Sequence, residues 1–76
     1  MSVKITRDSA HDLASSIKHR VHSRTYGRVW NLDVELSDQQ LVLRGRTSTY
    51  YTKQLAQHGA LEVLTGVPIL NAIEVA

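Results

Sequence analysis

Arginine and tyrosine side chains gather on both sides of an alternating apolar segment, residues 30–46. The candidate binding residues there are Arg24, Tyr26, Arg28, Arg46, Tyr50, Tyr51 and Lys53. A guanidinium group pairs phosphate oxygens through two parallel hydrogen bonds, and a tyrosine brings an apolar ring with a polar tip. Such side chains suit a contact with anionic headgroups or with a protein surface. The alternative is that the tyrosines cover the end of the core while the arginines keep its rim hydrated.

No pattern typical of catalysis or of metal binding accompanies these residues. His19 and His22 stand three residues apart, a spacing that can share a metal ion on a helix, but zinc needs further ligands and the chain has no cysteine. Nucleophilic catalysis needs a hydroxyl beside a base that a third group orients, whereas the serines here stand at predicted caps and turns. We therefore predict a protein that is not an enzyme and that uses no metal or cofactor.

The element that must position the candidate residues is a β-hairpin. Apolar residues occupy every second position in two runs, which are Trp30, Leu32, Val34 and Leu36, and then Leu41 and Leu43. The polar break at residues 37–40 separates the runs, which is typical of two strands with one buried face. This parity predicts that Trp30 lies in the core.

One register of the hairpin pairs apolar residues with each other on its inner face and polar or charged residues with each other on its outer face. With residues 37–40 as the loop, the buried pairs are Leu36 with Leu41, Val34 with Leu43, and Leu32 with Gly45. The outer pairs are then Asp33 with Arg44, and Asn31 with Arg46. The same register brings Tyr26 and Arg28 to the end of the sheet at which Arg46, Tyr50, Tyr51 and Lys53 lie.

Two amphipathic helices are predicted around the hairpin. The first runs from Asp8 or Ser9, as its cap, to about Ser23, and its apolar residues recur at three- and four-residue spacing. The second follows Thr47 or Ser48. We expect Gly59 to allow it a close approach to the sheet, and Gly66 to end it in the left-handed conformation.

The order of elements defines the fold class. A third strand over residues 69–75 completes an α-β-β-α-β order, which predicts an α+β two-layer sandwich with both helices on one face of a three-stranded mixed sheet. The helical connection makes the third strand parallel to the second, most simply by crossing the first strand to lie beside it. Residues 1–7 are expected to be a flexible N-terminus, and residues 8–76 a single domain.

Composition narrows the class of protein without naming a partner. The chain has 76 residues, no cysteine, and a net charge of +2 that is too small to imply a partner. A basic segment between Asp12 and Asp33 contains Lys18, His19, Arg20, His22, Arg24 and Arg28. No secretory signal and no run of 18 apolar residues is visible, so the sequence predicts a cytosolic, soluble chain, or a module of a longer envelope protein.

A longer residue pattern resembles the BON domain over residues 9–76. It consists of Asp-x-x-Leu-x-Leu-x-Gly at residues 38–45, Lys53, Ala56 and Ala60, then Gly66-Val67 and Leu70-Asn71-x-Ile73-x-Val75. The family is associated with bacterial osmotic-shock protection proteins, secretins, haemolysins and some channel proteins. Gly45, Gly66 and Asn71 match it, with expected roles in backbone approach, helix termination and polar bridging. Gln39 departs from it, because the family usually has glycine there.

The resemblance implies a binding module without enzymatic activity. Its expected partners are anionic membrane lipids or an envelope protein, and weak self-association is expected through the third strand if that strand is an edge. The alternative is a KH-like domain that binds RNA. KH domains clamp nucleic acid with a GXXG loop, and the glycines of this chain never occur at that spacing, so nucleic acid is the less favoured partner.

Overall fold

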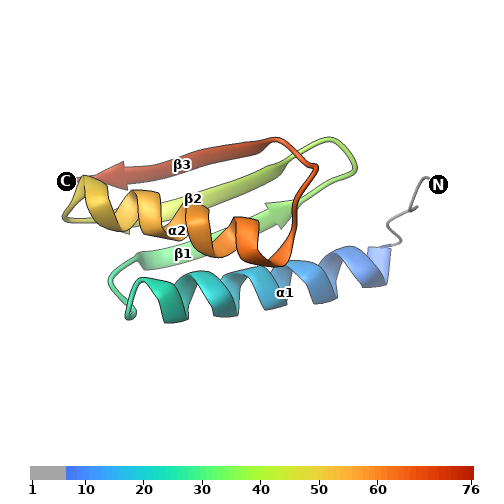
Figure 1. Cartoon of the computed structure of the whole chain (residues 1–76), viewed down its shortest axis with the longest axis horizontal. Helices are drawn as coiled ribbons and strands as arrows, with labels where there is room; N and C mark the ends of the chain where they lie inside the picture. The colour runs from blue at the N-terminus through green and yellow to red at the C-terminus, as the bar shows by residue number, and fades with distance from the viewer. Residues whose placement is uncertain (1–6) are drawn as a thin grey trace.

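The computed structural model describes the backbone of residues 7–76 and the side chains of residues 11–76. Its elements are α1 (Arg7–Arg24), β1 (Trp30–Leu36), β2 (Leu41–Thr47), α2 (Tyr50–Val63) and β3 (Ile69–Val75). Both helices lie on one face of the three-stranded sheet (Figure 1), so the predicted α+β fold and its α-β-β-α-β order are confirmed. The flexible N-terminus expected at residues 1–7 falls outside the described residues, except for Arg7, the first residue of α1.

The sheet has the strand order β1-β2-β3, with β1 antiparallel and β3 parallel to β2. The predicted direction of β3 is therefore right, but its predicted position beside β1 is wrong. The reason is the placement of the helices: α1 packs against β1, whereas α2 packs over β2 and β3. Because α1 already covers the face of β1, α2 returns the chain directly to the free edge of β2.

From its loop back to Asp33, the hairpin has the predicted register; beyond Asp33, toward the start of β1, it does not. The pairs Asp33–Arg44, Val34–Leu43 and Leu36–Leu41 form as predicted, but a β-bulge follows and Arg46 pairs with Trp30. The predicted Asn31–Arg46 and Leu32–Gly45 pairs are therefore wrong. Asn31 has a φ of 54°, the left-handed conformation that asparagine tolerates better than most residues.

The bulge reverses the parity of the strand and thereby moves Trp30. Trp30 shares the outer face of the sheet with Arg46 and is 53% exposed, so its predicted place in the core is wrong. Val29 is buried instead of Trp30, while Leu32 packs against the core as predicted. Gly45 permits this arrangement, because a Cβ atom at Gly45 would lie 2.8 Å from Val29 Cγ1 and 3.0 Å from the Trp30 carbonyl oxygen.

The core fills the space between the helices and the sheet. It consists of Ile17, Val21, Val29, Leu41, Leu43, Ala56, Ala60 and Ile73. Small residues on α2 let the helices pack closely. A Cβ atom at Gly59 would lie 3.3 Å from the Cα atom of Val21, so the close approach of Gly59 is to α1 and not, as predicted, to the sheet.

The ends of the helices differ from the prediction by a few residues. Asp8 and Ser9 lie inside α1, and Thr49 caps α2 by accepting a hydrogen bond from the Thr52 amide at 3.1 Å. Leu64 leaves α2 in an extended conformation and packs against the core. Gly66 therefore does not end the helix as predicted; its φ of +84° belongs to the connection that leads into β3.

The hairpin loop is closed by Ser37. Its amide donates to the Gln40 carbonyl oxygen at 3.0 Å, and its hydroxyl accepts the amides of Gln39 and Gln40 at 3.3 and 3.2 Å. No residue of this loop has a positive φ, so Gln39 is accommodated without backbone strain.

Candidate functional site

One end of the molecule carries the α1–β1 turn, the start of α2 and the end of β3 (Figure 1). The structure places three tyrosines here, and their exposed fractions are 83% for Tyr26, 64% for Tyr50 and 68% for Tyr51. Large aromatic side chains usually bury most of their surface. Three of them exposed at one end are the most conspicuous apolar feature of the described surface.

The α1–β1 turn holds Tyr26 outward. Thr25 is buried and its hydroxyl donates to the Val21 carbonyl oxygen at 2.8 Å, while the Gly27 amide donates to the His22 carbonyl oxygen at 2.9 Å. Tyr26 and Gly27 have φ values of 54° and 70°. The bonds of Thr25 and Gly27 hold the turn on either side of Tyr26, whose side chain projects into solvent.

Arg24 binds across the helix pair to Glu62 of α2. Its Nε donates to Glu62 Oε2 at 2.9 Å and its Nη2 donates to Oε1, so the guanidinium and the carboxylate form a bidentate pair. Arg20, one helical turn earlier, donates to the same Oε2 at 3.3 Å. Hydrogen bonds from Arg24 lower the pKa of the Glu62 carboxyl from its ordinary value. Two guanidinium groups thus share one ionised carboxylate, which leaves a local excess of positive charge.

A groove of about 450 Å³ runs beside this ion pair, between α1 and α2. We call it the helix groove; it is lined by Arg20, Ser23, Arg24, Tyr26, Tyr51 and Leu55. Its α2 residues stand four apart, as do the two arginines on α1, so each helix offers one face to the groove. No acidic residue is among the lining side chains.

The other predicted site residues lie apart from the helix groove. Arg46 is on the outer face of the sheet, where its Nη2 lies 3.6 Å from Glu74 Oε2. Lys53 is half-buried, and Arg28 and Tyr50 are exposed without lining the groove. The predicted set therefore divides, and only Arg24, Tyr26 and Tyr51 share one depression.

Sequence reasoning left Arg20 and Ser23 out of the site. The four-residue spacing of Arg20 and Arg24 within the basic segment was a signal for the first of them. No signal was available for Glu62, because its contact with both arginines depends on the approach of the helices at Gly59, where a Cβ atom would lie 3.3 Å from Arg24 Cγ.

Asn71 joins β3 to α2 beneath this end of the molecule. Its Nδ2 donates to the Lys53 carbonyl oxygen at 2.9 Å and to Gln57 Oε1 at 3.4 Å, and its Oδ1 accepts the Ile73 amide at 3.3 Å. These bonds fix the first turns of α2 on the sheet, and so they position Tyr51 and Leu55.

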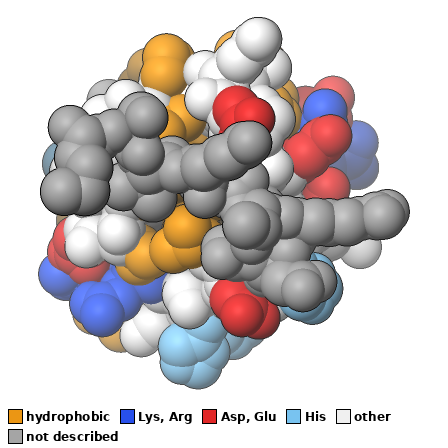
Figure 2. All heavy atoms as spheres, turned by 90° about the vertical axis from the view of Figure 1, so that its right-hand side faces the viewer, with side chains coloured by type: hydrophobic (Ala, Val, Ile, Leu, Met, Phe, Trp, Pro, Cys, Tyr) orange, Lys and Arg blue, Asp and Glu red, His pale blue; other side chains and the backbone are white. Residues whose placement is uncertain are grey.

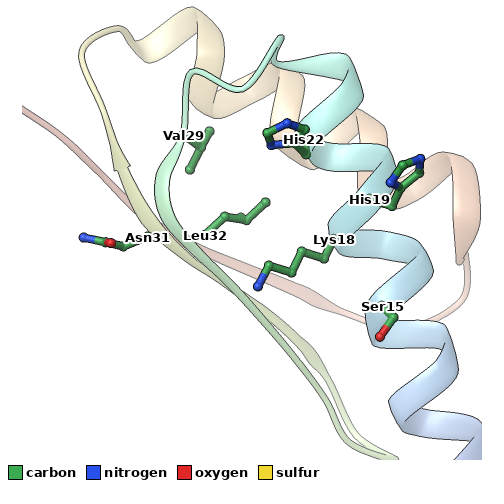
Figure 3. Close-up of a pocket in the computed structure, with 7 residues that line it drawn as sticks. All are labelled: Ser15, Lys18, His19, His22, Val29, Asn31 and Leu32. Atoms are coloured by element: carbon green, nitrogen blue, oxygen red, sulfur yellow. The ribbon is translucent and has the colours of Figure 1, made fainter.

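A second groove, of about 560 Å³, lies between α1 and β1 (Figure 3). Lys18 and Leu32 point into it from the two sides, whereas His19 and Asn31 point away from it. The two histidines therefore do not face each other, and the side chains of residues 11–76 contain no group of three His, Cys, Asp or Glu residues that could hold a metal ion. This groove offers a single charged group, Lys18, to a ligand.

The far end of the molecule has a different character. Figure 2 shows hydrophobic side chains near the middle of that face, with acidic, basic and histidine side chains mixed around them. Among the described residues of that face, side chains of both charges lie close to one another (Figure 2). The gathering of arginines with exposed tyrosines belongs to the helix groove.

The chain matches no known family model, no curated protein and no solved structure. Neither described helix is long and apolar enough to cross a lipid bilayer. The function must therefore be inferred from the surface itself, and the helix groove with its exposed tyrosines is the feature from which to infer it.

Proposed function

We propose that this chain is a non-enzymatic binding module that attaches to anionic phospholipid surfaces. The contact is made by the end of the molecule that carries Tyr26, Tyr50, Tyr51 and the helix groove. The observation that carries the proposal is the presence of three exposed tyrosines beside two arginines that share one carboxylate. The resemblance of the residue pattern to BON domains supports the same class of ligand.

The chemistry of these side chains fits a membrane interface. Tyrosine rings settle at the level of the headgroups, since the ring is apolar and the hydroxyl is hydrated. Arginine pairs with the phosphates, and each basic residue near an anionic surface contributes about 1 kcal/mol. Arg28 and the excess charge of the groove therefore support weak attachment that salt disrupts, and firm attachment requires several copies of the module.

Co-sedimentation with vesicles tests this proposal. We expect binding to vesicles of phosphatidylglycerol and phosphatidylcholine at low salt, weaker binding at high salt, and none to phosphatidylcholine alone. The double substitution Tyr26→Ala with Tyr51→Ala should reduce binding. Leu70→Ala is the control, because Leu70 is 53% exposed and lies near the start of β3, at the other end of the sheet (Figure 1). Equal binding to neutral and anionic vesicles, or an equal loss in the control, would refute the proposal.

Self-association through β3 is a second candidate, favoured by the position of this strand. β3 is an edge strand, and Leu70 and Val75 are 53% and 44% exposed. The Leu41 amide donates to the Pro68 carbonyl oxygen and the Ala76 amide to the Thr47 carbonyl oxygen. Since bonding alternates along a parallel ladder, the backbone groups of the odd-numbered residues of β3 face outward. Light scattering over a range of concentrations tests this candidate, and a strict monomer at high concentration would exclude it.

A further inference from the structure

We propose that the helix groove is a binding site for a phosphate monoester, which takes Arg20 and Arg24 away from Glu62, the carboxylate that holds them beside the groove in the free protein. This inference rests on the proposed function only for the source of the phosphate, a lipid headgroup. The site itself follows from the geometry of the α1–α2 contact.

Glu62 already makes the contacts that a phosphate would make. Arg24 holds both of its oxygens through Nε and Nη2, which is the bidentate geometry that arginine also uses for phosphate. Arg20 adds a third bond to Oε2. A phosphate monoester has three terminal oxygens, so it can accept from both guanidinium groups where the carboxylate has only two.

Charge favours a dianion over a monoanion in this groove. While Glu62 is bound to the two arginines, the net charge of the three side chains is +1. When the Glu62 side chain turns away, the two arginines present a charge of +2 to a ligand. The Glu62 side chain is 32% exposed and can turn toward solvent without a change in the core. A monoester carries close to two negative charges at neutral pH, whereas a diester carries one, so the monoester is the better electrostatic match.

Hydrogen-bond donors remain available for such a ligand. A guanidinium has five N–H donors, of which Glu62 takes two from Arg24 and one from Arg20. The groove is also lined by Ser23, Tyr26 and Tyr51, whose side chains carry hydroxyl groups, and by Leu55, which is apolar. At about 450 Å³, the groove lies within the roughly 300–1,000 Å³ that is common for small-ligand sites.

Protonation does not free the arginines near neutral pH. Hydrogen bonds from Arg24 lower the pKa of Glu62, so its carboxyl protonates at a lower pH than that of a free glutamate. Glu62 must instead be displaced by a competing anion. Glu62 therefore competes with phosphate for the two arginines and lowers the affinity of the site, so its removal should strengthen phosphate binding.

Titration with inorganic phosphate and with dimethyl phosphate, a diester, tests the site. NMR should show shifts at the Arg20 and Arg24 side chains and at the Tyr51 ring, larger for inorganic phosphate. Because two exposed ion pairs compete with the ligand, E62Q should tighten phosphate binding roughly three- to tenfold.

The control is E35Q, which removes the same charge from another exposed arginine pair, Glu35 with Arg44 at 2.7 Å on the outer face of the sheet. It should change phosphate affinity by less than twofold. Equal effects of E62Q and E35Q, or shifts that avoid the helix groove in both proteins, would overturn the proposal. R24K keeps the charge but loses the bidentate geometry, so it should weaken the binding of inorganic phosphate while the preference for the dianion remains.

Vesicle binding distinguishes the proposed phosphate site from the proposed membrane function. Vesicles with phosphatidic acid present a monoester, and those with phosphatidylglycerol a diester. Groove binding of soluble phosphate without vesicle binding would refute the membrane function and leave the site standing. Vesicle binding that E62Q and R24K leave unchanged would refute the site and leave the membrane function standing.

Discussion

Replacement of Gly45 by alanine should strongly destabilise the protein. Gly45 has a φ of +154°, which an L-residue rarely adopts, and an added Cβ atom would lie 2.8 Å from Val29 Cγ1 and 3.0 Å from the Trp30 carbonyl oxygen. The substitution therefore adds backbone strain and a steric clash to the same place, where β1 bulges.

The magnitude follows from these two terms. A residue forced into such a backbone conformation costs roughly 1–3 kcal/mol, and overpacking in a well-packed core costs about 1–3 kcal/mol more. A chain of this length is stable by about 4–11 kcal/mol, at roughly 0.05–0.15 kcal/mol per residue. The loss of about 2–6 kcal/mol is thus a large share of the free energy of unfolding.

Urea unfolding followed by far-UV circular dichroism measures this loss. Gly66→Ala is the matched control, because Gly66 has a φ of +84° but no atom within 4 Å of an added Cβ. It should show the strain alone, and Gly45→Ala should lose about 1–3 kcal/mol more than this control. Equal losses at the two positions would show that the close approach of β1 to Gly45 does not constrain the fold.

Three further predictions address the groove and its supports. Glu62 has a pKa below its ordinary value in the folded protein, so the stability from its ion pairs is present above the unfolded pKa and is lost as the pH falls through the folded value; E62Q should remove this part of the acid dependence of urea unfolding. Asn71→Ala breaks the bonds to α2 and to the Ile73 amide and should cost about 1–3 kcal/mol, whereas an unchanged urea midpoint would contradict the bridging role. Tyr26→Ala with Tyr51→Ala should weaken vesicle binding but leave the thermal midpoint within a few degrees of the original, since both rings are exposed.

Local patterns were sufficient where a residue's neighbours in sequence decide its environment. The alternation of Val34 and Leu36 with Asp33 and Glu35 specified the hairpin register near its loop, because a slip of one residue would bury the acids. The spacing of Ile17 and Val21 specified the buried face of α1. Both patterns repeat within a few residues, so the local sequence is enough to determine the register near the loop and the buried face of α1.

The sequence by itself determined the order of the elements, the buried face of α1 and the register of the hairpin near its loop. Only the tertiary structure decided the parity of Trp30, because the bulge depends on the room that Gly45 leaves on the neighbouring strand. Only the tertiary structure brought Glu62 to Arg20 and Arg24, across 42 and 38 positions of the chain. The physical reason is that both contacts depend on how closely two separate backbones approach, a distance that no periodicity within either segment records.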